Sequence, residues 1–232
     1  MPSNTPALRG DRTKRFFDMV VAAIALLFLA PVLLFIALVV KVCSPGPVLY
    51  RGVRVGLHGR LFSMLKFRSM VVNAESLGGS ATPADDQRLT NIGKFLRRYK
   101  LDELPQLLNV LAGDMSLVGP RPEVRKYVNL YTPEEKAILT VPPGITDWAS
   151  IWNSNEAAVL EGSRDPEKTY EELIRPTKLA LQLLYVRNHS LPMDLKIIFH
   201  TCMKLINDEW LPKELKPYGR VKRYRMTSPA SI

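Results

Sequence analysis

The chain has 232 residues, a formal net charge of +10 at pH 7, two cysteines and three histidines. So few cysteines and histidines, outside any CxxC motif, argue against a disulfide-rich or zinc-centred protein and favour a reducing compartment. The positive charge favours an anionic partner, whether nucleic acid, an acidic membrane surface or a phosphorylated substrate. The length suits one domain with a short appendage.

The first element is an uncharged run at residues 19–40, MVVAAIALLFLAPVLLFIALVV. As a helix, a run of this length reaches about 33 Å, close to the thickness of the bilayer core. A cleavable signal peptide is disfavoured because Lys41, Cys43 and Pro45 follow where small cleavage-site residues would stand. We therefore expect a membrane segment.

Basic residues flank this segment on both sides, namely Arg9, Arg12, Lys14 and Arg15 before it and Lys41, Arg51, Arg54 and Arg60 after it. The positive-inside rule places such charge on the cytoplasmic side, so a single crossing satisfies the rule at only one end. A re-entrant segment broken at Pro31 would leave both ends on one face. An ordinary span with a proline kink fits equally well, and the pattern alone leaves both topologies open.

After a break at residues 44–47, SPGP, two strands are expected at residues 48–55 and 61–70 around GLHGR, a β-hairpin signal. Residues 73–90 are small and polar and predict a mobile loop. Asn91 is a candidate N-cap for a basic helix that carries Lys94, Arg97 and Arg98.

Two adjacent acids, Asp102 and Glu103, stand in the stretch LDELP. In a purely structural interpretation, Asp102 is the N-cap of a helix, Pro105 lies in its first turn and Gly113 ends it. Capping by Asp102 and the dipole interaction of Glu103 would each contribute about 1 kcal/mol or less.

Cations on nearby elements favour a chemical role for the two acids; they are Lys66, Arg68, Arg97, Arg98 and Arg121. Arg121 stands in GPRP, where its backbone is constrained and its guanidinium suits phosphate. A pocket of this kind fits a diphosphate, with one acid as a magnesium ligand and the other as a nucleophile.

The C-terminal part begins with a turn at residues 141–144, VPPG, and Pro176 suits the first turn of a helix that ends near Arg187. From residue 195 an apolar helical stripe follows, made of Leu195, Ile198, Phe199, Cys202 and Ile206. Such a stripe covers either a membrane surface or the protein's own core. The basic residues after 208 predict a flexible tail that rests on anionic lipid or is solvated.

Together these stretches resemble the bacterial monotopic phosphoglycosyl transferases, sugar transferases of exopolysaccharide and glycoconjugate synthesis. The resemblance covers residues 14–206 and is carried by KRFFD, KFRSM, LDELPQLLNVLAGDMSLVGPRP, PGIT and DLKIIFHT in this order. It implies transfer of a phospho-sugar from a UDP-sugar to a polyprenol phosphate, usually undecaprenyl phosphate, with release of UMP.

The resemblance also implies site roles. Asp102 matches the nucleophile that holds the phospho-sugar covalently, and Glu103 matches the ligand of magnesium, the implied cofactor. Phosphate-binding roles are expected for Lys66, Arg68, Arg98 and Arg121. The break at Pro31 is implied to be re-entrant.

The chain departs from the common family pattern at several positions. Ala30 replaces a serine before the breaking proline, and Asp147 replaces a glycine after PGIT. The stretch WASIWNSNE lacks the arginine that members carry there, and Glu156 and Arg164 are the weaker candidates for substrate contact in this region. Nothing resembling a further module precedes Lys14, as in the small, single-module form.

We therefore expect an α+β, mostly helical fold: a re-entrant membrane helix-break-helix, a small β-hairpin, and interfacial amphipathic helices around a cytoplasmic catalytic core. The expected boundaries are a flexible N-terminus at 1–13, the membrane hairpin at 14–42, the transferase domain at 43–207 and the basic tail at 208–232. The expected location is the cytoplasmic face of the bacterial inner membrane.

The expected partners are a UDP-sugar, a polyprenol phosphate and membrane lipid, without nucleic acid; a homo-oligomer is left open. Three alternatives stand beside this hypothesis. One is a membrane-anchored basic adaptor, which leaves DELP and GPRP unexplained. Another is an inactive scaffold, which the intact Asp102 and Glu103 disfavour. The third is a glycosyl transferase that releases UDP instead of UMP.

Overall fold

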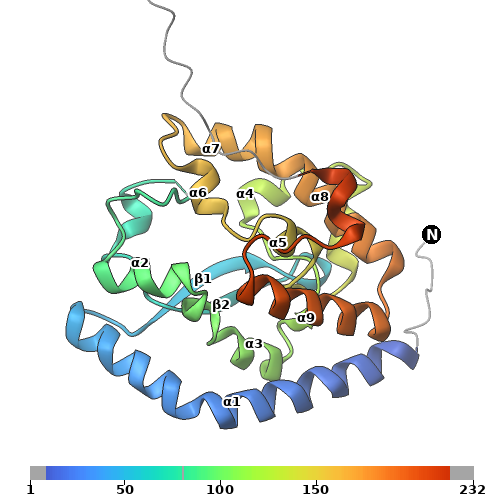
Figure 1. The fold of residues 1–232 in the computed structure, drawn as a ribbon, viewed down its shortest axis with the longest axis horizontal. Helices are drawn as coiled ribbons and strands as arrows, with labels where there is room; N and C mark the ends of the chain where they lie inside the picture. The colour runs from blue at the N-terminus through green and yellow to red at the C-terminus, as the bar shows by residue number, and fades with distance from the viewer. Residues whose placement is uncertain (1–8, 80, 220–232) are drawn as a thin grey trace, which may run out of the picture.

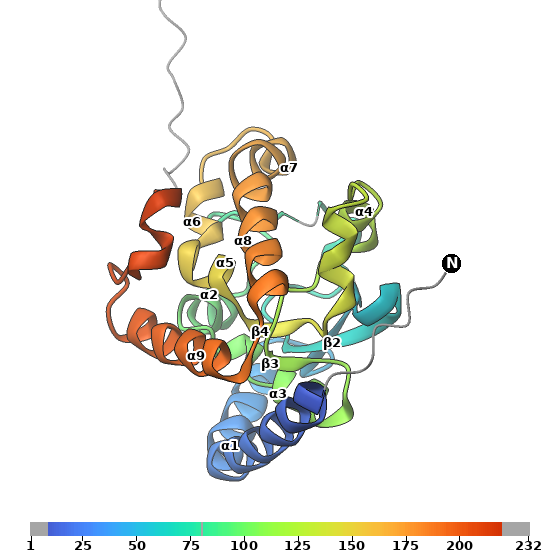
Figure 2. The same ribbon diagram turned by 90° about the vertical axis from the view of Figure 1, so that its right-hand side faces the viewer.

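The computed structural model describes residues 9–79 and 81–219. Its first element, α1 (Arg9–Cys43), is one continuous helix that contains Pro31, and it begins before the expected start at Lys14. By length and composition, residues Arg12–Cys43 suffice to cross a membrane. Two perpendicular views show α1 along one side of the molecule, with the other labelled elements on the opposite side of it (Figures 1 and 2).

Figure 1 shows a bend near the middle of α1. Pro31 supplies a physical cause, because it cannot donate the backbone hydrogen bond and its ring crowds the preceding turn. The expected helix-break-helix is therefore a single bent helix, since the helix runs without interruption from Arg9 to Cys43 and loses only the hydrogen bond that Pro31 cannot donate.

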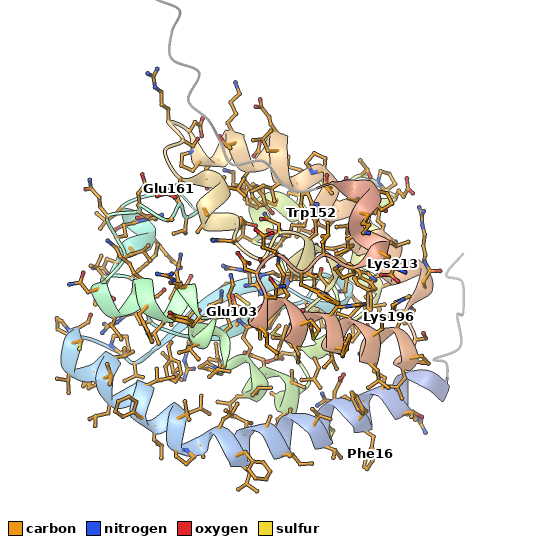
Figure 3. The ribbon with its side chains drawn as sticks, in the orientation of Figure 1. Phe16, Glu103, Trp152, Glu161, Lys196 and Lys213 are labelled. Atoms are coloured by element: carbon orange, nitrogen blue, oxygen red, sulfur yellow. The ribbon has the colours of Figure 1, made fainter. Side chains whose placement is uncertain are left out.

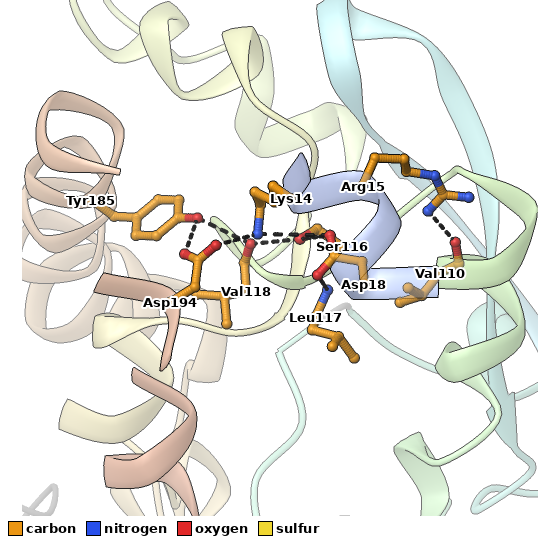
Figure 4. A network of polar contacts seen from close by, with 9 residues as sticks. All are labelled: Lys14, Arg15, Asp18, Val110, Ser116, Leu117, Val118, Tyr185 and Asp194. Carbon is orange, nitrogen blue, oxygen red and sulfur yellow. Dashed lines mark hydrogen bonds and ion pairs between the residues drawn. The ribbon is translucent and has the colours of Figure 1, made fainter. Parts of the chain in front are cut away.

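The N-terminal end of α1 is attached to the domain by buried polar contacts (Figure 4). Lys14 Nζ lies 2.5 Å from Asp194 Oδ2, and Ser116 Oγ donates to Asp18 Oδ2 at 2.7 Å. Arg15 Nη1 donates to the carbonyl oxygen of Val110 at 2.5 Å. The KRFFD stretch therefore fixes α1 to α9, β3 and α3.

The C-terminal half of α1 packs on the same domain through apolar contacts. Ile36 and Val40 form a buried cluster with Phe67 and Leu96. The remaining surface of α1 is rich in exposed apolar side chains: Phe16, Met19, Val20, Ile24, Leu27, Phe28, Val32, Leu34, Phe35, Leu38 and Val42. Both ends of α1 therefore contact one domain, and its outer face is left for an apolar environment.

The predicted hairpin is confirmed. Strands β1 (Leu49–Val55) and β2 (Leu61–Phe67) pair antiparallel, from Leu49 opposite Phe67 to Val55 opposite Leu61. His58 and Gly59 both take positive φ in the turn, as a tight connection between twisted strands requires.

The helix α2 (Asn91–Arg98) also forms, but its N-cap is Thr90 rather than Asn91. Thr90 Oγ1 accepts from the backbone N–H of Gly93 at 3.0 Å. Leu101–Glu103 then form one 3-10 turn, and α3 (Gln106–Ala112) ends at Gly113 as expected, with φ of 94°.

The structure contains a second pair of strands, which is parallel and which the sequence pattern does not predict. It joins β3 (Ser116–Val118) to β4 (Gly144–Thr146), with Ser116 opposite Gly144. Each of these strands is only three residues long. Local sequence patterns do not reveal them, because their pairing joins segments that are far apart in the chain. They bring GPRP and PGIT side by side.

Helices complete the domain around a core that includes Trp148, Ile151, Leu181, Tyr185 and Ile197. They are α4 (Arg125–Val128), α5 (Trp148–Trp152), α6 (Glu156–Leu160), α7 (Pro166–Thr169), α8 (Arg175–Asn188) and α9 (Leu191–Ile206). Pro176 lies in the first turn of α8, as predicted.

The apolar stripe of α9 is mostly turned outward. Asp194 and Ile197 face the core, whereas Leu195, Phe199 and Ile206 are exposed. The stripe therefore does not cover the protein's own core, apart from Ile198, which packs against it.

The described part of the expected tail, residues 208–219, is folded against the domain. Leu215 is fully buried, and Trp152 Nε1 donates to the carbonyl oxygen of Gly219 at 2.9 Å. The rest of the tail, at 220–232, and residues 1–8 of the expected flexible N-terminus lie outside the described residues.

Candidate functional site

The two acids of LDELP lie inside the 3-10 turn rather than before a helix. Lys100 precedes the turn in the left-handed region, with φ of 58°, and its carbonyl oxygen accepts from the N–H of Glu103 at 3.3 Å. The N-cap position of α3 is Pro105, and no side chain caps it. The capping role expected for Asp102 is therefore wrong.

Glu103, which is labelled in Figure 3, is held by two cations. Its Oε1 lies 2.8 Å from Lys66 Nζ, and Arg121 pairs with both of its oxygens, Nη1 donating to Oε2 at 2.9 Å. Burial alone would raise the pKa of Glu103, but Arg121 and Lys66 hold it well below the ordinary value. Burial likewise opposes the charge of Arg121, yet Glu103 raises the pKa of this guanidinium. Glu103 and Arg121 thus favour each other's charged form, whereas burial lowers the pKa of Lys66 and Glu103 opposes this shift.

Asp102 is in a different situation, although it is the neighbouring residue. Asp102 is buried, with 3% of its surface exposed. Among the described residues, none donates a hydrogen bond to its carboxylate or forms an ion pair with it. Burial raises the pKa of Asp102, Lys66 opposes this shift and Glu103 adds to it. The site thus combines one acid whose charge is matched with one acid whose oxygens are unpaired.

The backbone around Arg121 is fixed by buried polar groups. Its N–H donates to Asp147 Oδ2 at 3.3 Å, and Gln182 Nε2 donates to its carbonyl oxygen at 3.2 Å. Gly119 packs so closely against β4 that a Cβ there would lie 2.4 Å from the carbonyl oxygen of Pro142. Asp147, which departs from the common family pattern, thus holds the residue that pairs with Glu103.

A second buried cluster fixes the following residues. Lys178 Nζ pairs with Glu123 and donates to Tyr170 Oη at 2.9 Å, while Tyr170 Oη donates to Glu123 Oε1 at 2.6 Å. Burial and Glu123 both raise the pKa of Tyr170, so this hydroxyl remains protonated. α8 therefore holds GPRPE at two points, at Arg121 through Gln182 and at Glu123 through Lys178.

Two of the expected phosphate-binding residues do not join this group. The guanidinium of Arg68 is buried and donates to the carbonyl oxygens of Pro45 and Ser44, at 2.5 and 2.7 Å. Arg68 therefore fixes the backbone of the segment that follows α1. Arg98 is exposed, and its guanidinium lies 5.8 Å from the centre of the Tyr99 ring.

Arg97 faces the site in place of its neighbour. Its Nε donates to Ser69 Oγ at 2.9 Å, and burial lowers its pKa while the charge of Asp102 counteracts this shift. Helical spacing places Arg97 beside the buried Leu96 and one turn after the buried Gly93. That spacing is the signal by which the sequence distinguishes Arg97 from Arg98.

The weaker candidates separate as well. Glu156, at the start of α6, is close enough to raise the pKa of both Arg121 and Lys178. Arg164 is exposed. Of the two, Glu156 is therefore the one that lies near Arg121.

Adjacent carboxylates are the oxygen donors that magnesium prefers. No group of three or more His, Cys, Asp or Glu side chains gathers around a common point in the described residues. This donor set still fits magnesium at a diphosphate, because in such sites one or two carboxylates and the substrate's own phosphate oxygens bind the metal.

The family follows from comparison with known proteins. A family model described as "Bacterial sugar transferase" matches residues 9–208. The chain belongs to the bacterial sugar transferase family. The matched range contains α1, the acids of LDELP and GPRP, so the family resemblance expected from the sequence is confirmed.

The names of two relatives state the reaction that each of them catalyses. The chain is 40% identical over 198 residues to the UDP-glucose:undecaprenyl-phosphate glucose-1-phosphate transferase of Escherichia coli, covering 82% of this chain and 39% of the relative. It is 41% identical over 200 residues to the undecaprenyl-phosphate glucose phosphotransferase of Komagataeibacter xylinus, covering 83% and 36%. The chain therefore spans less than half the length of these two relatives.

A shorter relative matches over nearly its whole length. The exopolysaccharide production protein PSS of Rhizobium leguminosarum is 42% identical over 199 residues, covering 81% of this chain and 92% of the relative.

Proposed function

We propose that this chain transfers a sugar phosphate from a UDP-sugar to a polyprenol phosphate, with undecaprenyl phosphate as the acceptor, and releases UMP. The names of the Escherichia coli and Komagataeibacter relatives support the substrate classes. The observation that carries the proposal is the buried, unpaired carboxylate of Asp102 beside Glu103, whose own charge is matched by Lys66 and Arg121.

The reaction has two displacements at one phosphorus atom. An oxygen of Asp102 attacks the phosphorus that bears the sugar, and the bond from this phosphorus to the UMP oxygen breaks, so UMP leaves with the electron pair. A phosphate oxygen of the polyprenol phosphate then attacks the same phosphorus. The Asp102 carboxylate is released, and the lipid carries a diphosphate linked to the sugar.

The unpaired state of Asp102 suits this role because a lone pair of its carboxylate is available for attack on phosphorus. Glu103 would hold magnesium, which neutralises charge on the diphosphate when bound. In that case Arg121, Lys66 and Arg97 are available to contact phosphate oxygens, and their side chains already surround the two acids.

The second substrate explains why such a site needs a membrane. A polyprenol phosphate cannot leave the lipid, whereas a UDP-sugar is soluble in water, so the reacting atoms must meet at the bilayer surface. The attachment of both ends of α1 to one domain and its exposed apolar outer face support a re-entrant segment. The outward stripe of α9 supports an interfacial helix. We place the domain on the cytoplasmic face of the bacterial inner membrane.

The test of the chemistry is a panel of UDP-sugars supplied to the purified chain in nanodiscs without acceptor. One donor should add the mass of a sugar phosphate to the protein, and an equal amount of UMP should appear. Release of UDP would instead identify a glycosyl transferase. Absence of adduct with every donor would remove Asp102 as a nucleophile.

The metal role of Glu103 has its own test. EDTA should stop UMP release, and added magnesium should restore it. A Glu103→Gln variant should lose most of the activity at every magnesium concentration, because the amide can neither bind the metal as an anion nor pair with Arg121 and Lys66. Full activity in EDTA would contradict the metal role.

Topology is tested by labelling cysteines in intact spheroplasts. The exposed Cys43 and an Arg12→Cys substitution mark the two ends of α1, with Cys202 replaced by serine. A membrane-impermeant reagent should reach both positions only after the membrane is opened. Reaction of one position in intact spheroplasts would establish an ordinary span.

A further inference from the structure

Gln106, the first residue of α3, has a completely buried side chain. Neither its Oε1 nor its Nε2 has a hydrogen-bond partner among the residues that the structure describes. In that part of the chain, it is also the one side chain with two such atoms. An amide buried without partners destabilises the folded chain, so its presence requires an explanation.

The position of Gln106 links it to the two acids. It follows Glu103 by three residues and Asp102 by four on one helical segment. This segment opens with 3-10 hydrogen bonds, such as Leu107 N–H to the carbonyl oxygen of Leu104 at 3.2 Å, and continues as an α-helix. Residues three apart share a face in the first geometry, and residues three and four apart in the second. In either geometry, position 106 shares a face of the segment with at least one of the two acids.

A second buried amide on α3 shows what a structural role looks like. Asn109 Oδ1 accepts from the N–H of Leu65 at 2.9 Å, and its Nδ2 donates to the carbonyl oxygen of Ser63 at 2.8 Å. These bonds fix α3 to β2, the strand that carries Lys66. Gln106 makes no comparable contact, although it is buried at least as deeply.

We propose that Gln106 is a substrate-contacting residue whose Nε2 donates a hydrogen bond to a non-bridging oxygen of the phosphoryl group that Asp102 receives. The inference rests on the proposed function. When Asp102 is joined to the sugar phosphate, two non-bridging oxygens share one negative charge. The site already holds the cations Lys66, Arg97 and Arg121, and a neutral donor beside Asp102 can stabilise these oxygens without adding another charge. Oε1 then accepts from a hydroxyl of the attached sugar.

The test compares the same substitution at two equally buried glutamines, Gln106→Met and Gln182→Met. Adduct formation is followed by quenched intact-mass measurement with acceptor withheld, and thermal unfolding is measured in parallel. Gln106→Met should slow adduct formation on the order of 100-fold, as loss of one preorganised donor does. Its Tm should stay the same or rise, because unpaired polar atoms are removed. Gln182→Met should lower the Tm, because Arg121 and Asp147 lose a donor.

A Gln106→Glu variant provides a second measurement. It keeps the acceptor oxygen, loses the donor and adds a negative charge next to Asp102, so adduct formation should again be slow. Adduct formation at the wild-type rate in either Gln106 variant would overturn the inference, and so would a fall in Tm without a change in rate. If the wild-type protein forms no adduct with any donor, the proposed function fails as well, which distinguishes the two failures.

Discussion

Two buried clusters of acids and cations differ in whether every carboxylate has a hydrogen-bond or ion-pair partner among the described residues. At the N-terminal end of α1, the carboxylates of Asp18 and Asp194 are both paired, with Ser116, Lys14 and Tyr185 (Figure 4). In LDELP, one of two adjacent acids, Asp102, has no hydrogen-bond or ion-pair partner within residues 9–79 and 81–219. Full pairing minimises the free energy of buried charge, whereas an unpaired buried acid raises the free energy of the folded chain. Under the proposed function, this destabilisation falls on the acid that reacts.

The largest expected effect concerns the unpaired acid. Asp102→Asn should lower the rate of UMP release at least about 10,000-fold, because an amide cannot form the acyl phosphate. The rate is measured with donor and acceptor both present, and the exposed Glu161 supplies a control as Glu161→Gln, which should be fully active. Turnover of Asp102→Asn within tenfold of wild type would erase the distinction between the clusters.

The paired cluster should respond in stability instead. Asp194→Asn keeps the hydrogen bond from Tyr185 but removes the ion pair with Lys14, so the free energy of unfolding should fall by about 3 kcal/mol. Chemical unfolding in detergent micelles measures this change. The exposed pair of Arg187 and Glu134 is the control, since Arg187→Gln should cost about 1 kcal/mol or less.

The same substitution should leave the chemistry intact. Adduct formed per folded molecule of Asp194→Asn should match wild type. A variant that is stable yet unreactive would mean that the cluster at α1 takes part in the reaction.

Neighbouring arginines on α2 sharpen the comparison at a smaller scale. Arg97→Ala should reduce UMP release about 10-fold, because a phosphate oxygen loses a charge-assisted hydrogen bond. Arg98→Ala should have no measurable effect, since its guanidinium lies over Tyr99 at the surface. Equal losses from both substitutions, measured as kcat/KM for the donor, would show that α2 acts through its overall charge alone.

The smallest effect is a pH dependence outside both clusters. Burial would raise the pKa of Glu167, but hydrogen bonds from Lys126, Tyr127 and the Ala81 amide lower it to about 2. A depressed carboxylate pKa stabilises the fold above the ordinary value of 4.5, and this contribution is lost as the pH falls toward 2.

Glu167→Gln should therefore lower stability at pH 7 by about 1 kcal/mol or less, since the group is partly exposed. It should also flatten the pH dependence of unfolding between pH 5 and 3. An unchanged profile would mean that other acids dominate acid unfolding.

Particular residues show how far local pattern reaches. The hairpin around GLHGR, the end of α3 at Gly113 and the start of α8 at Pro176 follow from residues close in sequence, because turn and helix-end preferences act locally. The N-cap expected at Asp102 was wrong because it, too, rested on local preferences alone. LDELP fits a capped helix on its own, but the chain enters it from a left-handed Lys100 and forms a 3-10 turn.

The sequence by itself determined the long apolar helix, the family and the positions of the two adjacent acids, because hydropathy and ordered motifs are properties of the chain. The tertiary structure decided which charges meet. Arg121 reaches Glu103 because β3 pairs with β4 and Asp147 accepts a hydrogen bond from the backbone N–H of Arg121. Arg68 instead donates to carbonyl oxygens in the segment that follows α1. Partners separated by tens of residues are selected by packing and burial, and no local preference of either residue encodes that choice.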